Sequence, residues 1–277
     1  MPVANGFVVP GHEREERFRP LRVAICQTCE MVQLVDNWKP ADLFNANYAY
    51  YASTSRHMEA HFKALADDVL SHYILGAKDP FVVEIGSNDG ITLQHFRKFR
   101  HLGIDPSSNV AEKAREKGLS VVSAFFSKGF AKDVVEAHGQ ADVILATNVI
   151  CHLPNLNDIL EGFRVLLKPG GRIIGQDPYF HDVLARTSYD QIYDEHVFYF
   201  TKRSLANALR AHGLVLHATS HEEVHGGSLR YVVAHAGAPE ADGDESLHFS
   251  RLELFRDDVL DSRNELLVKL WNAKEEG

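Results

Sequence analysis

From residue 81 onward, short apolar runs alternate with segments whose apolar residues recur at helical spacing. The runs predict strands at residues 81–85, 101–105, 119–125, 141–148, from 172, at 214–220 and at 228–235. The helical spacing predicts helices at residues 109–117, 128–138, 156–167 and 204–212, with a further helix beginning at 91. This alternation is typical of an α/β protein with a parallel, doubly wound sheet.

The pattern before residue 80 is different. A tyrosine-rich run at 47–53 has the composition of a lid or of a segment packed on the core. A helix predicted over residues 55–77 would cover one face of the sheet. Short strand-like pieces are expected at residues 5–10, 21–25 and 31–35.

The chain therefore divides into three expected segments. Residues 1–45 form a small N-terminal segment, and residues 46–240 form the main domain. Residues 241–277 form a C-terminal segment, which from Leu247 has the pattern of an amphipathic helix.

Composition restricts the class of protein. The chain has 277 residues and a net charge of −9 without a basic stripe, which argues against nucleic acid as a main partner. No apolar run approaches the 18 or so residues of a membrane span, and the first residues lack a signal-peptide pattern. Three cysteines do not make a disulfide framework, so we expect a reducing cytoplasm.

Polar residues at the strand ends predict a binding site, because ligands of open α/β sheets lie outside the carboxyl ends of the strands. The first strand runs into a glycine loop at residues 86–90, which has neither a phosphate-loop lysine nor dinucleotide spacing. Asp105 ends the second strand, where a carboxylate holds the ribose of a nucleoside ligand; the alternative is a helix cap. The predicted ligand-binding residues are Glu84, Gly86, Ser87, Asn88, Asp105, Pro106 and Asn148.

The candidate chemistry lies in a polar insertion between residues 178 and 201. Tyr193, Glu195 and His196 offer a phenol, a carboxylate that orients a base, and an imidazole suited to proton abstraction. His152 follows the fourth strand. The competing interpretation is an ordinary polar loop.

The sequence offers two candidate metal sites. Cys26 and Cys29 form a C-x-x-C in a turn between strand-like pieces, which is half of a zinc ribbon. His12 is a conceivable further ligand, although a lone surface histidine is the simpler interpretation. A catalytic metal on His181, His196 and His225 is not expected, because no metal-binding helical motif accompanies them.

Seven strings, in order, resemble the nucleotide-sugar C-methyltransferases of deoxysugar biosynthesis in bacterial natural-product pathways: PLRVAICQTCEMVQLVD, VVEIGSNDGITLQHF, GIDPSSNVAEKA, ATNVICHLPNLND, LLKPGGRII, QIYDEHVFYF and HGGSLRYVV. The resemblance covers nearly the whole chain. It implies a class I methyltransferase fold, a Rossmann-like α/β sheet, that binds S-adenosylmethionine (SAM).

The resemblance also implies roles for particular residues. The substrate would be a TDP-linked 4-keto sugar, methylated on a carbon beside the ketone through an enolate. His196 would be the base, and Tyr193 and Glu195 would position it or bind the sugar. His152 would lie near the ketone or enolate oxygen, and Tyr48 or Tyr50 would close over it.

The chain departs from this family at both ends. The family carries a further C-x-x-C upstream and a further α/β domain downstream, so the chain is expected to be a fragment cut at both ends. Zinc binding is then incomplete in this chain. We expect a monomer with a small-molecule substrate.

Two alternatives remain open from the sequence. The same SAM domain serves O- or N-methyltransferases, in which His196 would deprotonate a hydroxyl group. A non-catalytic SAM-fold partner protein would bind SAM without turnover. The Tyr-x-Glu-His string favours catalysis, because a binding module has no need of it.

Overall fold

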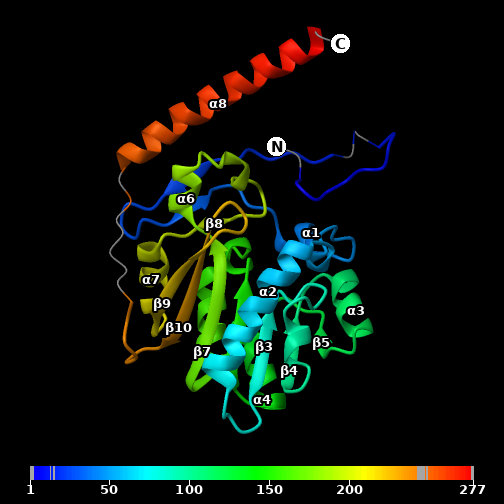
Figure 1. Ribbon diagram of the computed structural model, residues 1–277, viewed down its shortest axis with the longest axis vertical. Helices are drawn as coiled ribbons and strands as arrows, with labels where there is room; N and C mark the ends of the chain where they lie inside the picture. The colour runs from blue at the N-terminus through cyan, green and yellow to red at the C-terminus, as the bar shows by residue number, and fades with distance from the viewer. Residues whose placement is uncertain (1–2, 13, 15, 242–246, 248, 276–277) are drawn as a thin grey trace.

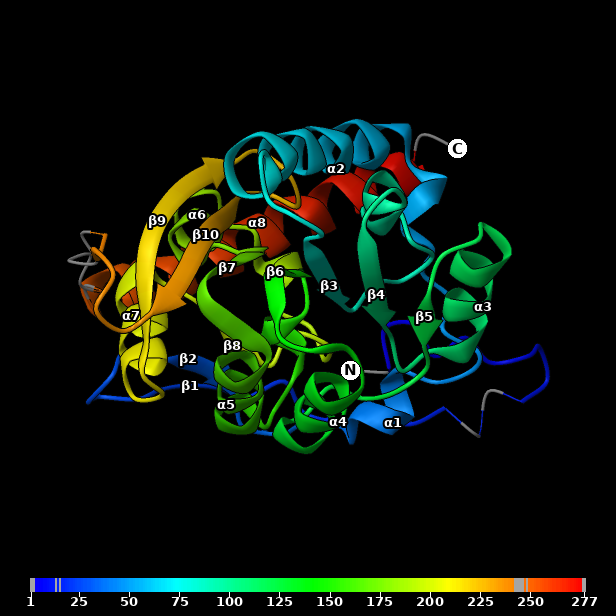
Figure 2. The same cartoon turned by 90° about the horizontal axis from the view of Figure 1, so that it is seen from below.

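A seven-stranded sheet forms the centre of the computed structural model, which describes residues 3–12, 14, 16–241, 247 and 249–275. Its strand order is β5-β4-β3-β6-β7-β10-β9 (Figures 1 and 2). The neighbours from β5 to β7 pair in parallel, and β10 is antiparallel to both β7 and β9. The strands are β3 (Phe81–Ile85), β4 (Arg100–Ile104), β5 (Val121–Val122), β6 (Ala141–Thr147), β7 (Leu167–Pro178), β9 (Leu214–Glu222) and β10 (Ser228–His235). The predicted α/β fold with a mostly parallel sheet is confirmed.

Helices cover both faces of this sheet, as Figure 2 shows. Successive strand residues point to opposite faces, so Val82 packs under α2 (Arg56–Val69) while Val83 faces the other helical layer. This layer contains α4 (Lys128–His138), α5 (Leu156–Leu166) and α7 (Lys202–Arg210). The Ser55 side chain caps the start of α2 by accepting the Met58 N–H at 3.4 Å. The helix α3 (Ser108–Glu116) packs beside β5.

Several predicted element boundaries are wrong. The helix expected from residue 91 is only a 3-10 helix, Leu93–Phe96, because the chain must pass from the end of β3 back to the start of β4 within residues 86–99. The strand expected at 119–125 pairs only through Val121–Val122, at the edge of the sheet. The fifth strand begins at Leu167 rather than 172, and residues 5–10 form no strand.

The N-terminal segment joins the polar insertion through a second, three-stranded sheet. The strands β1 (Val23–Ile25) and β2 (Val32–Leu34) form a hairpin, and β2 pairs with β8 (Phe198–Tyr199). Leu34 and Tyr199 pack with side chains of α6 (Phe180–Ala185). A short helix, α1 (Pro40–Leu43), then leads toward the tyrosine-rich run.

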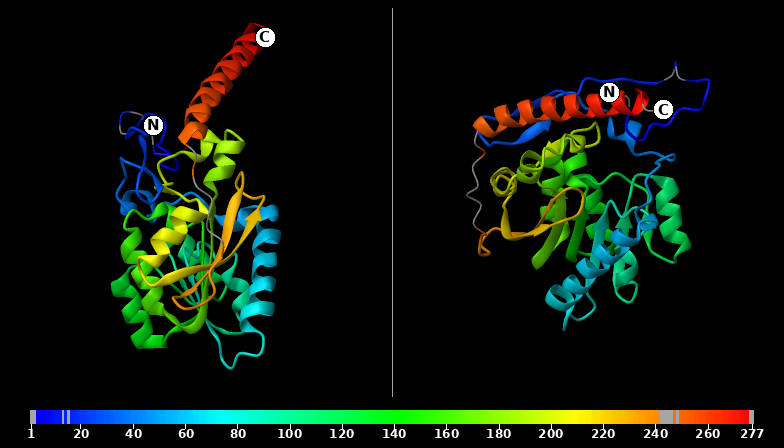
Figure 3. Two further views of the ribbon diagram at one scale, coloured as in Figure 1. Left: turned by 90° about the vertical axis from the view of Figure 1, so that its left-hand side faces the viewer. Right: turned by 45° about the horizontal axis from the view of Figure 1, so that its top comes forward.

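The C-terminal helix α8 (Phe249–Glu275) projects away from the sheet domain (Figure 3). Large apolar side chains along it, including Leu267 and Trp271, are exposed. Within the described residues, no helix combines the length and apolar character needed to cross a membrane.

Candidate active site

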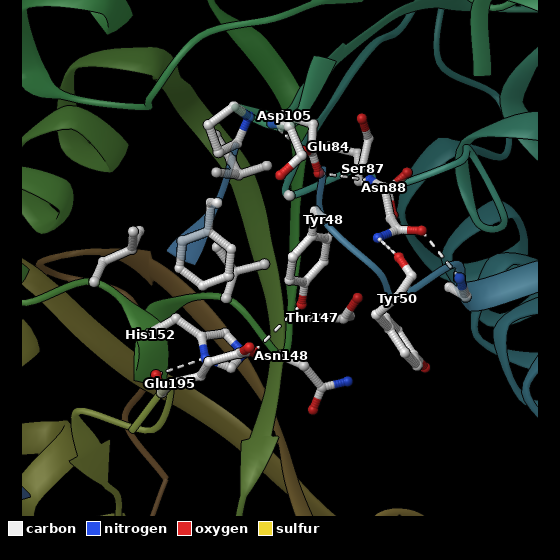
Figure 4. A pocket seen from close by; sticks show the side chains of 18 of the residues that line it. Tyr48, Tyr50, Glu84, Ser87, Asn88, Asp105, Thr147, Asn148, His152 and Glu195 are labelled. Carbon is white, nitrogen blue, oxygen red and sulfur yellow. Dashed lines mark hydrogen bonds between the residues drawn. The ribbon is translucent and has the colours of Figure 1, made fainter. Parts of the chain in front are cut away.

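A cavity of about 280 Å³ opens at the carboxyl ends of the central strands. Every residue predicted to bind the ligand or to act in catalysis lines it (Figure 4). His225 also lines it, whereas Cys26, Cys29, His12 and His181 do not. The lining residues that the sequence predicted are Tyr48, Tyr50, Glu84, Gly86, Ser87, Asn88, Asp105, Pro106, Asn148, His152, Tyr193, Glu195 and His196.

The glycine loop after β3 passes close to Val149, two residues after the end of β6. At Gly86, where φ is +67°, a Cβ would lie 2.3 Å from Val149 Cγ2. Only glycine allows this approach without displacement of one of the two segments. Asn88 then fixes the tyrosine-rich segment, because its side chain accepts the Ala52 N–H at 3.0 Å and donates to the Tyr50 carbonyl at 3.1 Å.

Asp105 joins the first loop to the second strand end. One carboxylate oxygen accepts the Asn88 N–H and the other accepts the Ser107 N–H, both at 2.8 Å. Ser107 is itself the residue that precedes α3, so Asp105 does not cap that helix in the usual way. Each oxygen keeps a lone pair for a further donor. Burial raises the pKa of Asp105 to about 6.

Glu84 lies at the floor of the same region and is almost fully buried. Its Oε2 has no hydrogen-bond partner within the described chain. Burial raises the pKa of Glu84 to about 8. A carboxyl group with this pKa is protonated at neutral pH, and a bound ligand can provide the missing hydrogen-bond partner of Oε2.

Two histidines occupy the other end of the cavity. His196 Nδ1 lies 2.8 Å from the Gln191 carbonyl oxygen, and His152 Nδ1 lies 2.8 Å from the Glu195 carbonyl oxygen. A carbonyl oxygen only accepts, so Nδ1 carries the hydrogen in each ring and Nε2 keeps a free lone pair. The ring centroids are 5.1 Å apart. Burial lowers the pKa of His196 to about 3 and that of His152 to about 4.

The carboxylate of Glu195 does not orient His196, contrary to the prediction. Its oxygens instead accept the Tyr48 hydroxyl at 3.3 Å and the Asn5 side-chain amide at 2.5 Å. Glu195 therefore ties the N-terminal segment and the tyrosine-rich run to the insertion. Its backbone carbonyl accepts a hydrogen bond from His152.

The phenols around the histidines are protonated donors. The Tyr193 ring packs on His196 with centroids 4.3 Å apart. Burial is the largest cause that raises the pKa of both Tyr48 and Tyr193. Tyr50 is exposed at the cavity rim.

Sequence reasoning missed a buried carboxylate behind the site. Asp177, near the end of β7, accepts the Tyr231 hydroxyl at 2.6 Å and the Cys151 N–H at 3.2 Å. It thereby holds the 3-10 turn Ile150–His152 that presents His152. The strand-end rule that found Asp105 would also have found Asp177. No local signal marks Asn5 or Phe44, which reach the cavity from the N-terminal segment.

The structure groups the potential metal ligands differently from the sequence expectations. Among the described residues, the one group of three whose ligand atoms lie within 4.8 Å of one another is Cys151, His152 and His196. Within the described part of the chain, His181, His196 and His225 do not form such a group, although His196 and His225 both line the cavity. Cys26 and Cys29 lie in the turn between β1 and β2 and belong to no such group, so the described residues do not provide a closed four-ligand zinc site there.

Comparison with known proteins assigns the family. A family model described as "Methyltransferase domain" matches residues 56–219, more than half of the chain. The chain belongs to this methyltransferase family. A second family model, described as "Putative zinc binding domain", matches residues 1–44 of the methyltransferase.

A curated relative is the C-methyltransferase NovU of Streptomyces niveus. It is 32% identical over 225 residues, a match that covers 80% of this chain and 53% of the relative. The methyltransferase chain therefore spans about half the length of the curated relative it matches. The predicted resemblance to a C-methyltransferase with an N-terminal zinc-binding segment is confirmed.

Solved structures confirm the class I methyltransferase fold. A SAM-dependent methyltransferase from Clostridium acetobutylicum matches with a TM-score of 0.50 and 12% identity, over 64% of this chain and 92% of that one. The plantazolicin methyltransferase BpumL, solved with S-adenosylhomocysteine (SAH), matches with a TM-score of 0.51 and 14% identity, over 65% of this chain and 86% of that one.

Proposed function

We propose that this methyltransferase uses SAM to methylate a carbon beside the C4 ketone of a TDP-linked 4-keto deoxysugar, through an enolate. The observation that carries the proposal is one cavity with two ends. One end has the glycine loop and Asp105, a carboxylate placed to bind ribose hydroxyls. The other end has the neutral imidazoles of His152 and His196, whose Nε2 lone pairs are free.

The residues at the first end fit SAM. The lone pairs left on Asp105 suit the two ribose hydroxyls, and Gly86 lines the same cavity. The unpartnered Oε2 of Glu84 offers a buried acceptor. SAM would supply a methyl group on a sulfonium, which is open to attack by a carbon nucleophile.

His196 is the proposed base. Its neutral imidazole can take the proton from the carbon beside the ketone at Nε2, while Nδ1–H stays bonded to the Gln191 carbonyl. The electron pair of the broken C–H bond moves into the enolate, whose oxygen needs hydrogen-bond donors. The Tyr193 hydroxyl is such a donor, because its raised pKa keeps it protonated, whereas the Tyr48 hydroxyl already donates to Glu195.

For His152 we propose a role other than the one that the resemblance implies. Its Nδ1–H is bonded to the Glu195 carbonyl, so Nε2 accepts hydrogen bonds and does not donate them to an enolate oxygen. We assign His152 Nε2 to a substrate hydroxyl.

The substrate class is supported by three observations. The string QIYDEHVFYF, which carries part of the resemblance to the sugar C-methyltransferases, supplies Tyr193, Glu195 and His196 to the cavity. The relative NovU is named as a C-methyltransferase. The cavity combines phenols and imidazoles, which suit a polar, hydroxylated substrate.

The test is product analysis. The chain is incubated with SAM carrying a ¹³C-labelled methyl group and TDP-4-keto-6-deoxyglucose, and the product is examined by NMR. We expect the labelled methyl group to be bonded to ring carbon C3 or C5. A label on oxygen or nitrogen would instead establish the alternative methyltransferase class. His138→Ala, at the far end of α4, is the matched histidine control and should leave the product unchanged.

A further inference from the structure

We propose that Cys151, His152 and His196 form a binding site for one divalent transition-metal ion of the zinc class, and that a bound ion switches the enzyme off. Their ligand atoms lie within 4.8 Å of one another. The site rests on this geometry, whereas its inhibitory effect rests on the proposed function.

The two imidazoles are oriented as metal ligands usually are. In metal sites, a histidine typically donates the hydrogen of its other ring nitrogen to a carbonyl or carboxylate, which fixes the ligating nitrogen as unprotonated. Both rings already do so here, His152 to the Glu195 carbonyl and His196 to the Gln191 carbonyl. Neither ring has to change tautomer to bind an ion.

Cys151 supplies the third ligand and selects the type of metal. It is buried, and Asp177 accepts its backbone N–H, which places it beside His152. One thiolate with two imidazoles favours zinc, cobalt or cadmium over magnesium or calcium, which prefer oxygen. The S–H bond is replaced by an S–metal bond, and one proton is released for each ion bound.

The distances require a modest closure of the cluster. Zinc bonds of about 2.0–2.1 Å to nitrogen and 2.3 Å to sulfur place tetrahedral ligand atoms roughly 3.3–3.6 Å apart. Because the ligand atoms lie within 4.8 Å of one another, the three side chains have to approach by at most about 1.5 Å. The adjoining cavity leaves the fourth position for water, an arrangement common to zinc sites with three protein ligands.

A metal ion bound at this site would prevent His196 from acting as the proposed base. The lone pair on His196 Nε2 cannot bind the metal and accept a substrate proton at once. Zinc would therefore inhibit proton abstraction, and a chelator would restore it.

Direct metal binding tests the site. The Cys26→Ser/Cys29→Ser variant serves as the parent, so that the N-terminal thiol pair contributes no signal. Titration with Co²⁺ under anaerobic conditions should give one equivalent bound, with a thiolate-to-cobalt charge-transfer band in the near ultraviolet. Adding Cys151→Ser should abolish that band and weaken binding at least tenfold, while circular dichroism and SAH binding stay at the parent level. Absence of the band in the parent, or an unchanged band after Cys151→Ser, would overturn the proposal.

Inhibition separates this proposal from the proposed function. With the sugar substrate, zinc should inhibit the parent reversibly, and Cys151→Ser should retain basal turnover with at least tenfold lower zinc sensitivity. Turnover that is equally zinc-sensitive in both proteins would contradict the switch. A cobalt band without turnover on any keto sugar would support the site and count against the proposed function alone.

Discussion

His152 and His196 lie side by side with ring centroids 5.1 Å apart, and each uses Nδ1 to contact the carbonyl of a residue in the same insertion. The insertion therefore sets the tautomer of both rings, and Nε2 of His196 is the free basic atom. The Nε2 atom of His152 is free in the same way, and we propose that it binds a substrate hydroxyl while Nε2 of His196 takes the proton.

We expect His196→Ala to reduce turnover by roughly 10²–10⁴-fold, the usual contribution of a general base. Added imidazole should restore part of the activity by occupying the space left by the ring. SAM affinity should stay near that of the parent, as measured by calorimetry. Turnover of His196→Ala at the parent rate would exclude His196 as the base.

Asp105 gives SAM affinity a dependence on pH. Its pKa of about 6 in the free protein means that it is ionised above this pH and protonated below it. The ribose hydroxyls bind the ionised form better, so SAM affinity should be highest above pH 7 and should fall as the pH drops through 6.

The control for this prediction is Asp105→Asn. It should weaken SAM binding at pH 8 by about 1.5–3 kcal/mol and remove the loss near pH 6. Glu84, with a pKa of about 8, titrates in both proteins, so the difference between the two affinity curves reports Asp105. Parallel curves would show that Asp105 does not contact the ligand.

Gly86→Ala should damage both stability and SAM binding. The added Cβ meets Val149 at 2.3 Å and also sits at a positive φ. Gly170→Ala is the matched control, since Gly170 has a similar φ of +82° but open space around the added atom. The control should cost about 1–2 kcal/mol of unfolding free energy in urea and leave SAM affinity intact. If both variants lost the same unfolding free energy, the clash between the added Cβ and Val149 would not destabilise the protein.

Tyr231→Phe should destabilise the fold by about 1.5–3 kcal/mol, because it removes a hydrogen bond to a buried carboxylate. The Tyr231 hydroxyl lies 2.6 Å from Asp177 Oδ2, and both residues are buried. Tyr73→Phe is the control, because the Tyr73 hydroxyl has no hydrogen bond in the described chain. Urea unfolding with closely similar midpoints for the two variants would contradict a structural role for the Asp177–Tyr231 pair.

Local patterns in the sequence were sufficient to predict one end of the cavity. Apolar runs predict the central strands, and parallel pairing brings the carboxyl ends of these strands to one edge of the sheet. Glu84, Asp105 and Asn148 could therefore be placed together. The helix expected after Gly90 is short because the return to β4 leaves little chain, and spacing of apolar residues does not record that limit.

Contacts between distant segments could not be predicted in this way. Asn5 binds Glu195 across 190 residues, and this pairing depends on how the N-terminal segment docks against the insertion. The carboxylate in Tyr-x-Glu-His was therefore expected beside His196, where its sequence neighbours suggested a catalytic role. Its partners in the structure are Tyr48 and Asn5.

The central claim is that His196 removes a proton from the carbon beside the sugar ketone. The most direct measurement is hydrogen exchange: the protein, SAH and TDP-4-keto-6-deoxyglucose are incubated in D₂O, and the C3 and C5 protons are followed by NMR. Because SAH has no methyl group to transfer, exchange reports proton abstraction alone. The account predicts loss of one signal faster than without protein, and loss of this effect in His196→Ala but not in His138→Ala. Exchange at the uncatalysed rate with SAH bound, or equal exchange in His196→Ala, would contradict it.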